Sequence, residues 1–200
     1  SSTCRVSIMS DRTLVGIGGL FDRSNPEVGL TNLEKLGFVD TYTFIVHSYD
    51  GGNNWTSLEI FETPLQKTPL EICSPIVECP DGRWLWPTAT WPIFDGSCPH
   101  GMKSIALISH DKGQTWTDYM VTMDKFDKRI VHWEQKIIRL DGKRILSMCW
   151  THDLAKGMDL PISIAISEDG GRSFNPPRST EIFGQTSRPI YVGDEKVLTI

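Results

Sequence analysis

The sequence predicts an all-β chain built from repeated units of four antiparallel strands, and three observations support this prediction. A motif of eight residues, S-x-D-x-G-x-x-[WF], occurs three times, at 48–55, 109–116 and 167–174. Its closing aromatic residues recur at a period of about 60 residues, and even spacing of this kind indicates an array of supersecondary units. A second type of turn recurs at the same period as the motif, and helical periodicity is scarce throughout the chain.

Each copy of the motif is typical of the turn in a β-hairpin. It follows an apolar strand, at 43–46, 104–108 and 162–166, and a second strand-like stretch comes after it. The Asp side chain accepts hydrogen bonds from backbone N–H groups of a tight turn, and the Gly supplies a positive φ without steric cost. We therefore expect a structural role for the three motif carboxylates, Asp50, Asp111 and Asp169.

A short turn between two apolar runs marks the first half of each unit. It is Asp-Gly at 81–82 and at 141–142, a strong hairpin signal between β runs, and Asp11 and Asp194 hold the corresponding places in the first and fourth units. Four antiparallel strands in about 60 residues make one blade of a β-propeller. We place the blades of this single domain, 1–200, at 4–62, 71–123 and 132–181, with the start of a fourth at 186–200.

Composition excludes several classes of function. The net charge is -5 and no basic tract is present, so we expect no nucleic-acid partner. No apolar run approaches the roughly 20 residues of a membrane span. The five cysteines contain no C-x-x-C pair, so we expect buried free thiols, no metal and no cofactor.

No signal peptide is visible at the N-terminus, which has neither a charged region nor an apolar one. The compartment is therefore unknown from the sequence. Our expectation leans towards a secreted or periplasmic protein whose leader has been removed.

The repeated motif resembles the Asp-box, or bacterial neuraminidase repeat, of sialidases and related six-bladed propellers. The resemblance covers nearly the whole chain, with one box in each of three blades. It implies that the boxes are structural and lie on the face away from the active site, and that the ligand is a carbohydrate. It also implies that this segment holds about half of the ring, with the remaining blades expected elsewhere.

Strand order predicts where a site would lie. The Asp-Gly turns and the Asp boxes share one face of the propeller, whereas the long loops at 21–40, 91–100 and 150–159 share the other. Long loops on a rigid scaffold are where binding residues concentrate. Alignment of the first strand of successive blades also places three polar residues at equivalent positions, where they can point into the central well. These are Ser74, Glu134 and Arg188.

The resemblance implies roles for five polar residues, two of which are in this set. Sialidases bind the carboxylate of their substrate with three Arg, and they use a Tyr nucleophile assisted by a Glu, with an Asp as acid/base. Arg188 looks like one of the carboxylate-binding Arg, and Arg5 or Arg23 like the first of them. Glu134 looks like the assisting Glu, and Asp40 is a candidate for the acid/base.

The third loop adds a candidate sugar-binding cluster. A His–carboxylate pair, His152-Asp153, follows Trp150, and Trp91 stands at the start of the second loop. An aromatic residue beside such a pair suits sugar binding, whereas the alternative is an Asp that forms a turn next to an unrelated His.

Departures from the sialidase pattern keep three functions open. The F-R-I-P motif is replaced by Cys-Arg-Val-Ser at 4–7, no Tyr can be assigned as the nucleophile, and no second Arg follows Glu134 at the expected distance. The first hypothesis is a sialidase-like exo-glycosidase acting on terminal sugars. The second is a non-catalytic propeller that binds a glycan or a protein, and the third is a related glycosidase acting on a neutral or uronic sugar.

Overall fold

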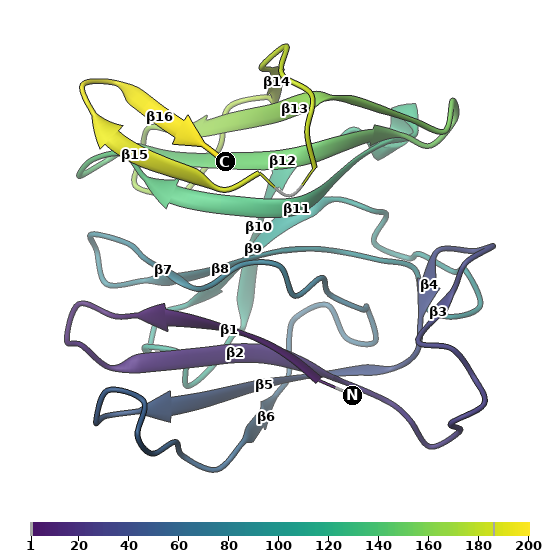
Figure 1. The fold of residues 1–200 in the computed structure, drawn as a ribbon, viewed down its shortest axis with the longest axis horizontal. Coiled ribbons are helices and arrows are strands. Elements are labelled where there is room, and N and C mark those ends of the chain that lie inside the picture. The colour runs from purple at the N-terminus through teal and green to yellow at the C-terminus, as the bar shows by residue number, and fades with distance from the viewer. Residues whose placement is uncertain (1, 186) are drawn as a thin grey trace.

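The computed structural model describes residues 2–185 and 187–200, and it contains three four-stranded antiparallel sheets followed by a two-stranded hairpin (Figure 1). The predicted fold class, all-β with four-stranded antiparallel blades, is confirmed. We call these sheets blades 1 to 4 in chain order. Within the described ranges, the one helical element is a 3₁₀ turn, Phe126–Lys128.

Blade 1 consists of β1 (Ser2–Ile8), β2 (Leu14–Phe21), β5 (Thr41–Ser48) and β6 (Glu59–Phe61). Blade 2 consists of β7 (Val77–Glu78), β8 (Trp84–Ala89), β9 (Ser104–Ser109) and β10 (Asp118–Met123). Blade 3 consists of β11 (Ile130–Arg139), β12 (Ile145–Asp153), β13 (Met158–Ser167) and β14 (Arg178–Ser179). Blade 4 is the hairpin of β15 (Pro189–Gly193) and β16 (Lys196–Thr199), and a small hairpin of β3 (Thr31–Asn32) and β4 (Gly37–Phe38) extends the first long loop.

The hydrophobic core lies between successive blades. One cluster joins blades 1 and 2, with Ile17 and Ile45 packed near Trp86 and Trp116, and a second joins blades 2 and 3. Burial of one large apolar side chain contributes about 1.5–3 kcal/mol. Stacking of sheet on sheet, visible from the bottom to the top of Figure 1, is therefore what holds the blades in a fixed order.

The Asp boxes close on themselves through side-chain hydrogen bonds. In blade 2 the Ser109 hydroxyl donates to Oδ1 of Asp111 at 2.7 Å, and Asp111 accepts from the backbone N–H and the hydroxyl of Thr115 at 2.9 and 2.6 Å. Gly113 has a φ of +86°, and a Cβ there would lie 2.9 Å from the ring of Trp84. The serine and the aspartate form corresponding bonds in the boxes of Asp50 and Asp169.

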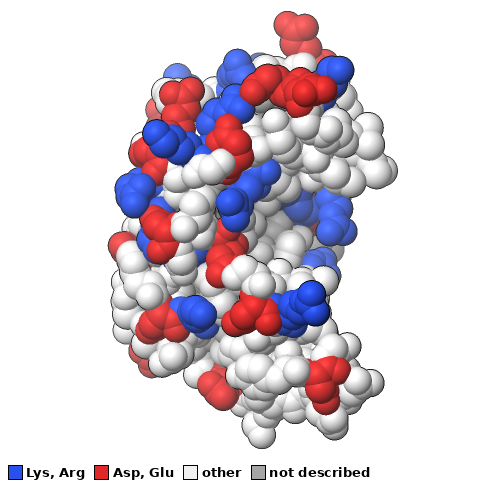
Figure 2. All heavy atoms as spheres, turned by 90° about the vertical axis from the view of Figure 1, so that its left-hand side faces the viewer, with Lys and Arg blue, Asp and Glu red and all other residues white. Residues whose placement is uncertain are grey.

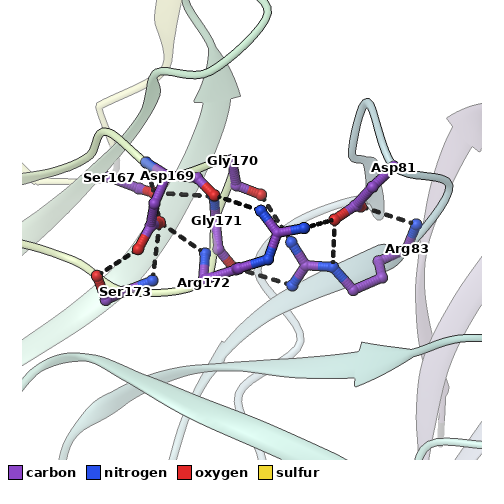
Figure 3. A network of polar contacts seen from close by, with 8 residues as sticks. All are labelled: Asp81, Arg83, Ser167, Asp169, Gly170, Gly171, Arg172 and Ser173. Carbon is purple, nitrogen blue, oxygen red and sulfur yellow. Dashed lines mark hydrogen bonds and ion pairs between the residues drawn. The ribbon is translucent and has the colours of Figure 1, made fainter.

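The box of blade 3 is also bonded to the preceding blade (Figure 3). The Arg83 guanidinium of blade 2 donates to the backbone oxygens of Gly170 and Gly171 at 2.8 and 3.1 Å, and its Nε pairs with Asp81 at 2.9 Å. Arg172 reaches back from the box to the same Asp81 oxygen at 2.9 Å. We call Asp81, Arg83 and Arg172 the blade clamp, because they link blades 2 and 3.

Two faces of the molecule follow from this arrangement. The strand 1–2 turns and the Asp boxes lie together at the left of Figure 1, and the long loops with the β3–β4 hairpin lie at the right. The first of these faces is viewed in Figure 2, where acidic and basic side chains are interspersed and the outline is a crescent hollowed on one side. In the part of the chain that is described, no helix has the length and apolar character that crossing a membrane requires.

All five cysteines are free thiols, as expected, but the expected burial holds for three of them only. Cys73, Cys79 and Cys149 are buried, Cys98 is partly buried, and Cys4 is exposed. Burial raises the pKa of the Cys149 thiol to about 12, so this side chain is an inert part of the core.

Candidate functional site

A cavity of about 410 Å³ lies where the first strands of the four blades converge. Its volume falls in the range of small-ligand sites, roughly 300–1,000 Å³. Each blade contributes lining residues on its first strand or next to it. They are Cys4, Arg5 and Val6 of blade 1, Cys73 and Pro75 of blade 2, Glu134 and Lys136 of blade 3, and Arg188 beside blade 4. We call this the central cavity.

Glu134 lies in the central cavity because β11 carries a β-bulge at this point. The pairing of β11 with β12 shifts register between Trp133 and Lys136, and Glu134 takes a left-handed conformation with a φ of +52°. Bulges occur next to functional sites, where they redirect a side chain. The backbone N–H of Glu134 donates to Oε2 of Glu71 at 2.8 Å.

Glu71, which the sequence analysis did not name, does not line the central cavity itself but contacts Glu134, which does. It comes just before the first strand of blade 2, and its backbone is fixed by bonds to Ala89 and Thr88 at the end of β8. Burial and the neighbouring negative charge of Glu134 raise the pKa of Glu71 to about 7. A carboxyl group that is half protonated at neutral pH can donate a proton to a substrate and later take one back.

Lys136 is a second residue that sequence reasoning did not single out. Its ammonium group lies 3.4 Å from Oε2 of Glu134 and donates to the backbone oxygens of Cys73 and Glu134 at 3.0 and 3.2 Å. The side chain is largely buried, so the ion pair is well shielded from solvent. The two neighbouring carboxyl groups thus differ: Glu134 is ion-paired, and Glu71 has a raised pKa.

Arg188 and Arg5 bring further positive charge to the central cavity from opposite ends of the chain. Both residues are exposed, and neither side chain forms an ion pair with a carboxylate within 2–185 and 187–200. The backbone of Arg188 is fixed by its pairing with Ile200. Two available guanidinium groups beside a carboxyl pair suit a ligand that carries an anionic group.

Asp40 and Arg23 lie elsewhere. Neither lines the central cavity. Arg23 donates to the backbone oxygens of Val28 and Pro26 at 2.5 and 2.8 Å, so its guanidinium holds its own loop together. Asp40 is exposed just before β5, and its backbone oxygen accepts from the N–H of Asp22 at 2.8 Å. Their roles in catalysis and binding stay predictions.

The predicted aromatic cluster forms at the loop face between blades 2 and 3. The rings of Trp91 and Trp133 stack with centroids 4.9 Å apart, and Trp133 also stacks on His152 at 5.5 Å. Trp150 meets Trp133 edge-on at 5.0 Å. Trp133, which the sequence analysis did not name, is the buried centre of this cluster.

The carboxylate that pairs with His152 is Asp159, not the adjacent Asp153. Oδ1 of Asp159 lies 2.8 Å from Nδ1 of His152 and accepts from the Trp150 indole N–H at 2.9 Å. The hydrogen bond from His152 is the main reason that the pKa of Asp159 is lowered. Asp153 is buried and accepts from the backbone N–H groups of Ala155 and Lys156, which is the turn-forming alternative.

Solved structures share this fold over nearly the whole chain. A protein of unknown function from Dyadobacter fermentans matches 99% of it with a TM-score of 0.70 and 19% identity. An α-L-arabinanase from Penicillium chrysogenum, solved with arabinobiose, matches 94% with a TM-score of 0.59 and 14% identity. The NanB sialidase from Streptococcus pneumoniae matches 92% with a TM-score of 0.58 and 13% identity.

By fold, the chain consists of β-propeller blades that carry Asp-box turns. It spans 56%, 52% and 39% of these three solved chains, respectively. No family model and no curated protein sequence matches the chain of this Asp-box propeller. At such low identities the likeness concerns the fold, and function has to be argued from the site itself.

Proposed function

We propose that this Asp-box propeller is an exo-glycosidase that removes terminal sugars, with its reaction centre at the central cavity. The observation that carries the proposal is the contact of Glu71 with Glu134, whose backbone N–H donates to the Glu71 carboxyl group at 2.8 Å. Glycoside hydrolysis generally needs one carboxylic acid to protonate the leaving oxygen and one carboxylate on the other side of the scissile bond. Glu71, whose pKa is raised, and Glu134, which is ion-paired with Lys136, are the two groups that we assign to these roles.

Each carboxyl group receives a role from its surroundings. Glu71, with a pKa of about 7, is the general acid that gives its proton to the departing glycosidic oxygen. Glu134, ion-paired with Lys136, is the carboxylate that attacks the anomeric carbon or activates the water that does. If Glu134 attacks, a glycosyl-enzyme forms, and Glu71 takes a proton from the water that then displaces Glu134 from the sugar. If Glu134 instead activates the water, Glu134 takes the proton of that water, and exchange with solvent then restores the proton on Glu71 and removes the one on Glu134.

Hydrolysis of aryl glycosides by the full-length protein tests this proposal. The panel contains an aryl α-sialoside, an aryl uronide and an aryl α-L-arabinofuranoside. Glu71→Gln and Glu134→Gln are each expected to lower kcat by about 10²–10⁴-fold, the usual contribution of a general acid or base. The exposed Glu62→Gln serves as a matched control and should leave kcat unchanged. If the folded protein turns over none of the three substrates, the glycosidase proposal fails.

The pH dependence gives a sharper check on Glu71. Since the general acid must be protonated, kcat should fall as the pH rises above about 7. A profile of kcat against pH between 5 and 9 measures this limb. If kcat of an active Glu71→Gln variant still falls at high pH, the general acid is a group other than Glu71.

The two free guanidinium groups favour an acidic sugar, sialic or uronic, over a neutral one. Arg5→Gln and Arg188→Gln should each raise KM for the anionic substrates by roughly tenfold or more, in line with loss of a hydrogen bond to a charged group. The arabinofuranoside is the comparison. If KM for the neutral substrate rises by the same factor, these arginines maintain the shape of the cavity and do not bind the anionic group.

A non-catalytic propeller that binds a glycan or a protein is the second candidate. It is favoured by the placement of Asp40 and Arg23 away from the central cavity, because the resemblance to sialidases assigned chemistry to both. Glycan binding by calorimetry, without turnover and with unchanged affinity in Glu71→Gln, would support this alternative.

A further inference from the structure

The backbone at Glu134 has a conformation that the residue itself does not favour. A non-glycine residue with a φ of +52° costs on the order of 1–3 kcal/mol, so the surrounding structure must hold it in place. Something next to this residue must therefore stabilise the β-bulge of β11.

Gln135, the next residue along, is fully buried and has an unusually complete set of bonds. In the orientation that satisfies every group, its amide nitrogen donates to the backbone oxygens of Thr88 and Ile105 at 2.9 and 2.8 Å. Its amide oxygen accepts from the hydroxyls of Thr122 and Ser147 at 2.7 and 2.9 Å. Three of these four partners belong to blade 2, so one side chain of blade 3 is anchored in its neighbour.

The backbone of the bulge is tied to blade 2 as well. The hydroxyl of Ser74, which is buried, donates to the backbone oxygen of Gln135. The N–H of Glu134 donates to Glu71 at 2.8 Å. The side-chain amide of Gln135 and these two backbone hydrogen bonds therefore all tie the bulge to blade 2.

We propose that Gln135 is a positioning residue: its buried amide holds the β-bulge in which Glu134 takes its left-handed conformation and donates its backbone N–H to Glu71. The inference deepens the proposed function and rests on it for its kinetic consequence, whereas its structural consequence can be tested without any activity. Ser74 supports the same bulge from blade 2 and has the smaller share, because it contributes one bond where Gln135 contributes four.

Gln135→Met tests the proposal, because methionine keeps the length of the side chain and removes all four hydrogen bonds. In a crystal structure of the full-length variant, residue 134 should leave the positive-φ region and its N–H bond to Glu71 should be lost. A bulge that keeps both the φ and the bond would overturn the proposal. This readout holds whether or not the protein proves to be a glycosidase.

Kinetics separate positioning from general destabilisation. Gln135→Met should lower kcat by about 10²-fold with KM changed less than about twofold, because misplacement of a reacting group by about 1 Å costs that much. Ile17→Val, which trims a fully buried side chain between blades 1 and 2, lowers stability without touching the bulge and is the control. An equal loss of kcat in Ile17→Val would show that stability alone explains the effect and would overturn the proposal.

Ser74→Ala keeps the inference falsifiable if Gln135→Met does not fold. It removes a single hydroxyl and should lower kcat by about three- to tenfold, the loss expected for one hydrogen bond of about 1 kcal/mol. An unchanged kcat together with an unchanged bulge in the Ser74→Ala crystal structure would contradict the proposal.

Discussion

Glu71 illustrates how a single carboxyl group can link stability to chemistry. Its pKa of about 7 exceeds the ordinary value of 4.5, so between these two pH values the folded protein binds more protons than the unfolded chain. Stability from this group is therefore complete below about pH 4.5 and is lost as the pH rises through 7. The group that suits proton donation thus weakens the fold at alkaline pH.

We expect Glu71→Gln to remove this loss. At pH 8 the variant no longer buries a charge at this position, so its Tm should exceed that of the parent protein by about 2–4 °C for each kcal/mol of stability gained. At pH 4 the two proteins should have the same Tm. Thermal unfolding at both pH values measures the difference, with Glu62→Gln as the exposed control. An identical difference in Tm at the two pH values would contradict this prediction.

At the scale of single residues, the sequence located part of the central cavity. Alignment of first strands brought Glu134 and Arg188 to equivalent positions, and both line the cavity in the structure. Glu71 carries no motif, and its contact with Glu134 depends on how two blades pack. The available signal was a carboxylate inside an otherwise apolar run, Leu70-Glu-Ile-Cys73, because such a group needs a reason to be there.

At the scale of structural elements, the Asp boxes are the best-predicted feature of the chain. Their geometry is local, since the serine, aspartate and glycine of each box bond within eight residues of one another. The long loop of blade 1 shows the opposite case. The conformation of Arg23 is set by two backbone oxygens of its own loop. The spacing of residues in the sequence does not predict where those oxygens lie.

Loss of one box carboxylate should destabilise its blade. Asp111→Ala removes the acceptor for the Ser109 hydroxyl and for two groups of Thr115, so we expect a cost of about 2–4 kcal/mol in the free energy of unfolding. Asp127→Ala, at an exposed carboxylate of the 3₁₀ turn, should change it by less than about 0.5 kcal/mol. Urea unfolding measures both free energies. Equal losses of stability in the two variants would contradict a structural role for the Asp box.

At the scale of the whole molecule, the blades are joined on the Asp-box face by ion pairs and on the loop face by aromatic rings. The blade clamp joins blades 2 and 3, and a similar link joins blades 3 and 4, where Arg144 contacts Glu195 through two bonds of 2.6 Å. These polar links leave the opposite face free for long loops.

The two arginines of the blade clamp should differ in their contributions. Arg83, whose side chain is 11% exposed and bonds to two backbone oxygens, should lose about 1–3 kcal/mol of stability on change to Lys, which cannot reproduce the planar fork. Arg172, whose side chain is 62% exposed, should lose less than about 1 kcal/mol on the same change. Chemical denaturation of the two variants compares them, and the reverse order would be inconsistent with the clamp as described.

The stacked rings of Trp91 and Trp133 have a spectroscopic consequence. One indole comes from the loop after β8 of blade 2 and the other from the first strand of blade 3, and their nearly parallel planes lie close enough for their excited states to couple. The contribution of this coupling to the circular dichroism is lost when the two rings move apart. His152 also stacks on Trp133, with ring centroids 5.5 Å apart. The junction between the two blades thus carries an intrinsic optical probe, and docking of these blades can be followed in real time without any label.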